Sequence, residues 1–286
     1  MLPGYINSGS AVGPDKVQMH LNFGFSAVQI LWTLTFAALL VLLVVLLGRD
    51  RARRFPWFTI SIVLMALRMV ASRLLYGKMA PMVSSEIFLV LAVAAAIVAL
   101  LVVVEMARRG FSAASRTAWI TATLVLVVVG VVVLVLWGPW PSAKTLFAGS
   151  TLGVLRLMQL IAQRAETLAD LLVIQLGILV VLFGRRFHAG WRSHVQQIVI
   201  GLSTAAIAQL AVRIVWQLIA LHTTIHQQSD YVRVMAMQEK FFNADGAIYV
   251  AVLVWWIVCL WIDEPGAKAA EAPAEVATAT ESESAS

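Results

Sequence analysis

The amino-acid sequence predicts an all-α protein, a polytopic bundle of seven transmembrane helices. Three observations predict it: 61% of the 286 residues are hydrophobic, only 13% are charged, and the mean hydropathy is +0.88. Soluble domains average about half apolar and a quarter charged residues. Disordered chains are poor in the valine, leucine and isoleucine that form long runs here. The composition therefore excludes an ordinary soluble domain and a largely disordered chain.

Seven segments have about the 20 apolar residues that a helix needs to cross about 30 Å of hydrocarbon. Ala37 to Leu47 and Leu124 to Leu136 are apolar on every side, so periodicity cannot distinguish helix from strand there. Strand edges in lipid would leave backbone groups unpaired, and the alternation of an outer-membrane barrel is absent. We predict helices at Phe25–Leu47, Trp57–Tyr76, Glu86–Met106, Thr117–Trp137, Thr167–Phe183, Val195–Leu221 and Gly246–Ile262.

The two ends of the chain differ from this apolar region. Residues 1–24 are polar, lack a basic leader region, and precede a span that a basic stop sequence follows, so we expect an uncleaved anchor. Residues 263–286 consist mainly of Ala, Glu, Pro, Thr and Ser, which cannot bury a core, and we expect a disordered acidic cytoplasmic tail. Residues 25–262 then form one transmembrane bundle.

Positive charges between the spans predict the orientation, because they favour the cytoplasmic side. Ten arginines occupy the short loops after the first, third and fifth spans, whereas seven basic residues are spread over the longer segments of the opposite side. We expect the N-terminus outside, the C-terminus inside and the bacterial inner membrane as the location. Tryptophans should ring both interfaces. The inner ring would hold Trp57, Trp119, Trp255, Trp256 and Trp261, and the outer ring Trp137, Trp140 and Trp216.

The outer connections are longer. Gly138, Pro139 and Pro141 break the helix after the fourth span, and Thr151 to Ala165 then resumes an amphipathic pattern. This segment is either a helix on the outer face or a continuation of the fifth span. The stretch from His222 to Asp245 is polar and is predicted to be a connection. Together these segments could cover the outer mouth of the bundle.

Polar residues within the predicted spans mark the candidate site. An ionisable group costs about 2.5 to 3.5 kcal/mol at mid-membrane, so it normally faces the bundle interior and has a partner or a function. Depth places the candidates in the outer half, and those of the sixth span repeat every four residues. The candidates are Arg68, Arg73, Asp170, Gln209, Arg213 and Gln217.

Two interpretations of these residues stay open. In the first, the arginines of an outward-facing pocket bind a small anionic ligand through bidentate contacts. In the second, Arg213 or Arg68 pairs with Asp170, Arg73 reaches the outer headgroups, and the glutamines join helices. Glu105, at the inner interface, is predicted to be a helix-end partner of the arginines that follow it.

Metal and cofactor sites have little support. His222 and His226 have the spacing of paired helical metal ligands, but the sequence nearby offers no third His and no Cys, and a solvated pair is the simpler interpretation. No His lies within a span to hold haem, and no Lys lies there to bind retinal. The single Cys259 excludes an intramolecular disulfide. We expect no cofactor.

Catalysis and nucleic-acid binding are also not expected. There is no sequential Ser–His dyad, no phosphate-binding glycine loop and no carboxylate cluster at metal spacing, so no enzyme activity is predicted. The formal charge of +6 comes from arginines in short loops rather than from one basic face, which argues against a nucleic-acid partner.

Two short segments resemble uncharacterised bacterial seven-helix membrane proteins and the N-out seven-helix sensor regions that precede cytoplasmic signalling domains. They are the basic loop that runs through Arg54, Phe55, Pro56, Trp57 and Phe58, and the third span's end at Glu105 with Arg108 and Arg109. The resemblance implies the same topology. It carries over no functional residue.

The sequence therefore favours a sensor-like or receptor-like membrane module, or a partner subunit. Its expected partners are the lipid bilayer, a small anionic ligand on the outer side, and a membrane or cytoplasmic protein. A small-solute transporter or channel that uses the same polar stripe is the alternative, although a continuous polar route through the inner half is missing. A purely structural subunit is the third hypothesis.

Overall fold

The computed structural model describes residues 27–75, 78, 81–111, 116–136, 151–183, 193–222 and 228–263. Regular structure in these ranges is entirely helical. The predicted N-terminal segment, the C-terminal tail beyond Asp263 and several connections lie outside them. The helices are α1 (Ala27–Gly48), α2 (Arg51–Arg54), α3 (Pro56–Leu75), α4 (Pro81–Gly110), α5 (Arg116–Leu136), α7 (Thr151–Phe183), α8 (His194–His222) and α9 (Gln228–Trp261).

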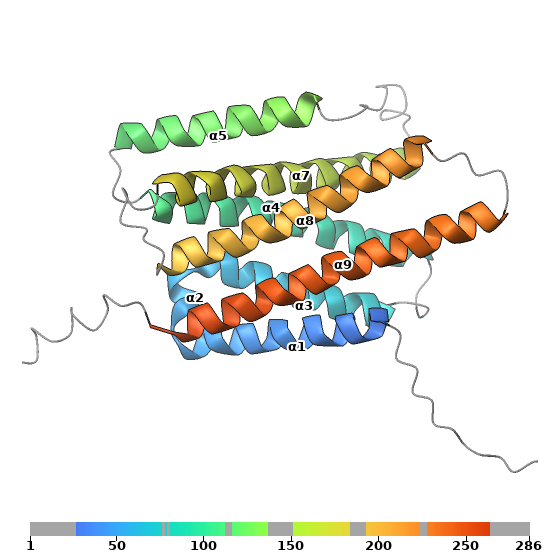
Figure 1. Cartoon of the computed structure of the whole chain (residues 1–286), viewed down its shortest axis with the longest axis horizontal. Coiled ribbons are helices and arrows are strands. Elements are labelled where there is room, and N and C mark those ends of the chain that lie inside the picture. Colours follow the sequence, from blue (N-terminus) through green and yellow to red (C-terminus); the bar gives the residue numbers. More distant parts are fainter. Residues whose placement is uncertain are drawn as a thin grey trace, which may run out of the picture.

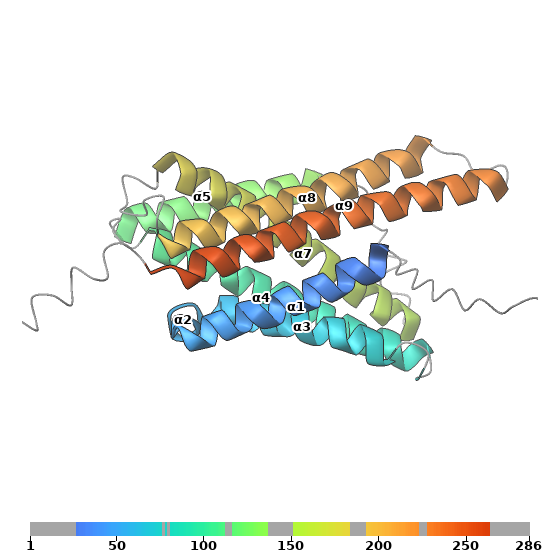
Figure 2. The ribbon, with the colours of Figure 1, turned by 60° about the horizontal axis from the view of Figure 1, so that its bottom comes forward.

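Six long helices form a closed ring. Each of α1, α3, α4, α7, α8 and α9 packs on the next, and α9 packs back on α1 (Figures 1 and 2). Helix α5 lies outside this ring, mainly against α7, where Gly130 approaches Leu168 and Leu172. The short α2 turns the chain from α1 into α3.

The ring consists of two three-helix halves joined through α5. The first half is α1, α3 and α4, and the second is α7, α8 and α9. In each half the first helix packs on the second and the second on the third, and the third packs on the first helix of the other half. Helices α1 and α7 run in the same direction (Figure 1). The two halves therefore share the same packing order of their three helices, and their first helices run in the same direction.

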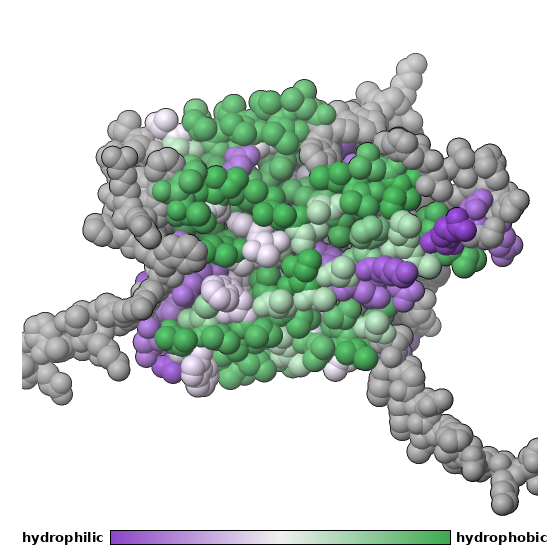
Figure 3. All heavy atoms as spheres, viewed as in Figure 1, coloured by the Kyte–Doolittle hydropathy of each residue, from purple (hydrophilic) through white to green (hydrophobic). Residues whose placement is uncertain are grey.

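The outer surface has the apolarity of a membrane protein. The six ring helices are each long and apolar enough to cross a bilayer, and the apolar stretch Ile120–Leu136 of α5 is shorter. Large aliphatic side chains are exposed along all of these helices, and Figure 3 shows them as a broad hydrophobic surface across the bundle. The prediction of an all-helical, multi-pass membrane protein is confirmed, whereas seven crossings and their orientation stay predictions.

The structure extends two of the predicted helices, α7 and α9, at their N-terminal ends. Helix α7 is continuous from Thr151, so the amphipathic segment before the fifth span belongs to the same helix. Most of the predicted polar connection from His222 to Asp245 is wrong, because α9 begins at Gln228 and extends along α8 (Figure 1). Four residues of this segment are partly buried at helical spacing: Val234, Gln238, Phe241 and Asp245. Packing of this face against neighbouring helices therefore keeps the segment helical, although its composition is polar.

The main core lies toward the end of the bundle that carries Arg49–Arg54 and Arg108–Arg109. Its centre is Phe58, whose ring meets the edge of Trp256 with centroids 5.1 Å apart. The side chain of Trp256 is only 1% exposed, so its predicted place in the interfacial ring is wrong. Gly201 of α8 provides the space for this indole, because a Cβ there would collide with it. Trp57, Trp255 and Trp261 are exposed near this end, as predicted.

Candidate functional site

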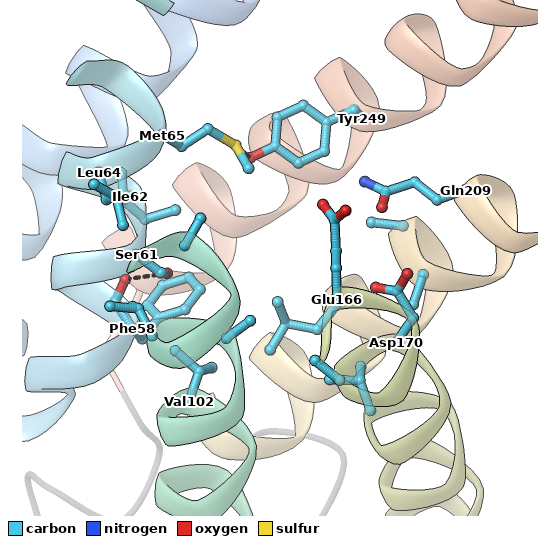
Figure 4. A pocket seen from close by; sticks show the side chains of 18 of the residues that line it. Phe58, Ser61, Ile62, Leu64, Met65, Val102, Glu166, Asp170, Gln209 and Tyr249 are labelled. Carbon is cyan, nitrogen blue, oxygen red and sulfur yellow. Dashed lines mark hydrogen bonds between the residues drawn. The ribbon is translucent and has the colours of Figure 1, made fainter. Parts of the chain in front are cut away.

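A cavity of about 160 Å³ lies inside the ring. Helices from both halves line it: α3 and α4 from the first, and α7, α8 and α9 from the second (Figure 4). Its wall toward the arginine-rich end is apolar and includes Phe58, Ile62, Val102 and Trp256. The polar residues that line the rest are Ser61, Arg68, Glu166, Asp170, Gln209 and Tyr249.

Most of these polar groups lie at one depth. Arg68 is 12 residues from Pro56, and Asp170 is 13 residues from Phe183, both counted from the arginine-rich end. Gln209 is 15 residues from His194 and Tyr249 is 12 from Trp261. At about 1.5 Å per residue, all four lie about 18 to 22 Å from that end, just past the middle of about 30 Å of hydrocarbon.

Arg213 is already held by the helix that faces it. Its Nη2 lies 3.2 Å from Glu166 Oε2, its Nη1 lies 3.4 Å from Asp170 Oδ2, and Nη1 also donates to Thr167 Oγ1 at 3.0 Å. Asp245 of α9 also interacts electrostatically with Arg213. One guanidinium therefore pairs with two carboxyl groups of α7, and the Arg213–Asp170 pair joins α7 to α8 as the structural interpretation of the sequence predicted.

Arg68 differs from Arg213. It lines the cavity and is exposed, and it has no ion-pair or hydrogen-bond partner among the residues that the structure describes. An arginine at this depth in lipid requires water or an anionic group nearby. The cavity is the polar environment within its reach.

On the opposite wall, Glu166 of α7 points into the cavity (Figure 4). Gln209 and Tyr249 lie above it in the same view, and the Tyr249 hydroxyl donates to Met65 Sδ at 2.6 Å, which links α9 to α3. The side chain of Glu166 is 44% exposed, against 15% for Asp170. Glu166 is thus the more accessible of the two carboxylates beside Arg213.

The remaining predicted site residues lie elsewhere. Arg73 is exposed and sits over the ring of Trp32, 5.8 Å from its centroid. Gln217 is exposed on α8, and it does not line the cavity. The described residues contain no group of three potential metal ligands, and the side chain of His222 and all of His226 lie outside them.

Glu105 belongs to a separate structural site. Its side chain is buried, and Oε1 lies 3.6 Å from Arg109 Nη2, which matches the predicted helix-end pairing. Oε2 also accepts a hydrogen bond from the backbone N–H of Phe58 at 3.0 Å. A carboxylate from α4 thus caps the N-terminal turn of α3, where backbone donors and the helix dipole favour negative charge.

Four residues of the site were absent from the sequence prediction: Glu166, Thr167, Asp245 and Tyr249. The sequence contained a signal for two of them, because Glu166 is four residues before Asp170 and Thr167 is three before it, on the same helix face. Asp245 and Tyr249 share a face of α9 in the same way, but Asp245 was assigned to a connection. Comparison with family models, curated proteins and solved structures finds no match.

Proposed function

We propose that the protein is a carrier that binds a small polar solute in its central cavity and moves it across the membrane. The observation that carries this proposal is a mid-depth cavity between two similar halves, lined by charged side chains from both. Parallel structural repeats with a site at their interface near the midplane occur in many secondary transporters. Ionisable residues within membrane spans commonly mark solute or ion pathways.

The packed core closes the cavity toward the arginine-rich end, as expected in one state of a carrier. Phe55, Phe58 and Trp256 are almost fully buried between the cavity and the arginine-rich end. A carrier has one side closed at a time, and the other state would require the two halves to move against each other at the α4–α7 and α1–α9 contacts. The absence of a continuous polar route in the sequence is consistent with alternating closure.

Solute counterflow tests the proposal. The purified chain would be reconstituted into liposomes loaded with a mixture of small metabolites, and exchange with isotope-labelled counterparts would be measured. Ala99 lines the cavity, so Ala99→Leu should block exchange by filling it. Ala251→Leu is the matched control, because Ala251 is exposed on α9 and does not line the cavity. Exchange that is absent, or equal in both variants, would contradict the proposal.

The packed core at the arginine-rich end also favours a second function. If the closure is permanent, the cavity is reached from one side only, and the protein is a receptor or sensor, as the sequence favoured. Such a receptor would bind a solute without exchange in the liposome assay. Binding that Ala99→Leu abolishes, together with zero flux for every bound solute, would select this function.

A further inference from the structure

Arginines lie on the second helix of each half. Arg68 lies in α3, the second helix of the first half, and Arg213 lies in α8, the second helix of the second. Their surroundings in sequence match: residues 66–70 read ALRMV and residues 211–215 read AVRIV. The two segments lie at different depths, because Arg68 is 12 residues from the start of α3 at Pro56 and Arg213 is 19 residues from the start of α8 at His194.

Their partners are not equivalent. Arg213 contacts Glu166 and Asp170 of α7, the first helix of its half. The corresponding helix α1 contains no Asp or Glu, so Arg68 has no such partner. Among the described residues, Arg68 therefore has a guanidinium without an ion-pair partner on the α3 side of the cavity.

The opposite side of the cavity carries carboxyl groups. Glu166 and Asp170 both pair with Arg213, and Glu166 is the one that points into the cavity (Figure 4). Helix α7 therefore offers a carboxylate where α3 offers a cation. The amide of Gln209 lies near Glu166, whereas the Tyr249 hydroxyl is directed at Met65 on the α3 side (Figure 4).

We infer that the cavity binds a small zwitterion of the amino-acid class. Its carboxylate is held by the fork of Arg68 and its ammonium by Glu166, while its apolar atoms face Ile62 and Val102. The volume of about 160 Å³ is close to that of a cavity of about 150 Å³ that accepts benzene, so ligands of about five to eight non-hydrogen atoms fit. This inference rests on the proposed use of the cavity as a solute site.

Matched ligands test the two charges separately. Melting midpoints of the protein in lipid nanodiscs would be measured with glycine, L-alanine, L-serine and γ-aminobutyrate. The same measurement would use their analogues without the amine (acetate, propionate, 3-hydroxypropionate and butyrate). It would also use those without the carboxylate (methylammonium, ethylammonium, ethanolammonium and propylammonium). At least one zwitterion should raise the midpoint, while its two analogues do not at equal concentration. No effect from any zwitterion, or an equal effect from an analogue, would overturn the inference.

Variants then assign the contacts. Arg68→Gln and Glu166→Gln should each weaken zwitterion binding about tenfold or more, because each removes a charge-assisted contact. Arg73→Gln is the control: this arginine is exposed on the same helix and lies outside the cavity. A similar loss in all three variants would overturn the assignment. Melting midpoints without ligand identify any variant that merely unfolds. The Arg68→Lys variant keeps the positive charge and should bind the zwitterion more tightly than Arg68→Gln.

The inference and the proposed carrier function can fail separately. If counterflow shows exchange of a purely anionic or neutral solute that Ala99→Leu blocks, the carrier stands and the zwitterion assignment is wrong. If a zwitterion binds as expected but never exchanges, the assignment stands and the carrier is wrong.

Discussion

Buried and intramembrane charges in this protein mostly come with specific partners. Glu105 accepts a backbone N–H from Phe58 and pairs with Arg109, and Arg213 is held by Glu166, Asp170 and Thr167. Removing one partner from such a group leaves the other uncompensated, which costs more than the contact itself contributes. At the scale of single residues, these contacts predict large effects of small substitutions.

Glu105→Ala should lower the stability of the bundle by about 1 to 3 kcal/mol, because it removes the cap of α3 and leaves the Phe58 N–H without its acceptor. Denaturant titration in detergent would measure the change. Glu86→Ala is the control, since Glu86 is an exposed glutamate on the same helix, and it should change stability by about 0.5 kcal/mol or less. Equal effects would show that the cap contributes nothing.

Arg213→Ala should destabilise the protein by about 1 to 3 kcal/mol, because Glu166 and Asp170 lose the cation that pairs with both and Thr167 loses a hydrogen-bond donor. Asp170→Asn in the same background should recover part of the loss by removing one of these charges. Arg233→Ala, at an exposed position of α9, should be nearly neutral. Thermal unfolding in one detergent compares all variants, and a failure of Asp170→Asn to recover stability would contradict the charge argument.

At the scale of elements, α7 and α8 pack closely because small residues face each other. The Ser203 hydroxyl donates to the carbonyl oxygen of Val173 at 2.9 Å, which joins the two helices across their interface. A Cβ on Gly177 would lie 2.9 Å from Ser203 Cβ, closer than side chains tolerate. Close backbone approach through small residues is a common basis of helix association in membranes.

Gly177→Ala should therefore destabilise the protein by about 1 to 3 kcal/mol through overpacking. Gly48→Ala provides the comparison: nothing lies within 4 Å of a Cβ there, so the helix preference for alanine should make it neutral or slightly stabilising. Unfolding midpoints of the two variants in one detergent test the contrast. A stable Gly177→Ala protein would show that α7 and α8 can separate without cost.

At the scale of the whole molecule, the ring closes where α1 meets α9. Arg49 and Arg51 both approach Asp263, at 3.4 and 3.0 Å, beside the other arginines of this end. Exposed ion pairs of this kind contribute little stability, so burial of Leu39, Leu42 and Leu253 must hold the seam. The concentration of arginines at this end is what predicts its cytoplasmic location.

Reporter fusions test that orientation and the count of seven crossings. A reporter active only outside the cytoplasm should be active at the N-terminus and when inserted at Lys78, and inactive after Ser286 and when inserted at Asp50. An odd number of crossings places the two termini on opposite sides. Two active or two inactive termini would contradict seven crossings.

Hydropathy was sufficient to predict the helical class and the seven apolar helices within a few residues at most ends. These properties depend on each segment's own transfer from water to lipid, which composition alone determines. Of the candidate site residues, Arg68, Asp170 and Gln209 line the cavity, and their role as a ligand site stays a prediction. The starts of α7 and α9 were harder to predict, because there a polar segment is helical only through periodic contacts with a neighbour.

Only the tertiary structure decided which charges meet. The sequence placed three arginines and one aspartate in the outer half of the spans. It did not show that Glu166 and Asp170 would both pair with Arg213, or that Arg68 would have no ion-pair partner among the described residues. It also could not place α5 outside the ring or Trp256 inside the core. The physical reason is that transfer of an apolar side chain from water to lipid is equally favourable on any face of a helix. Only close packing between helices therefore determines which faces point into the bundle.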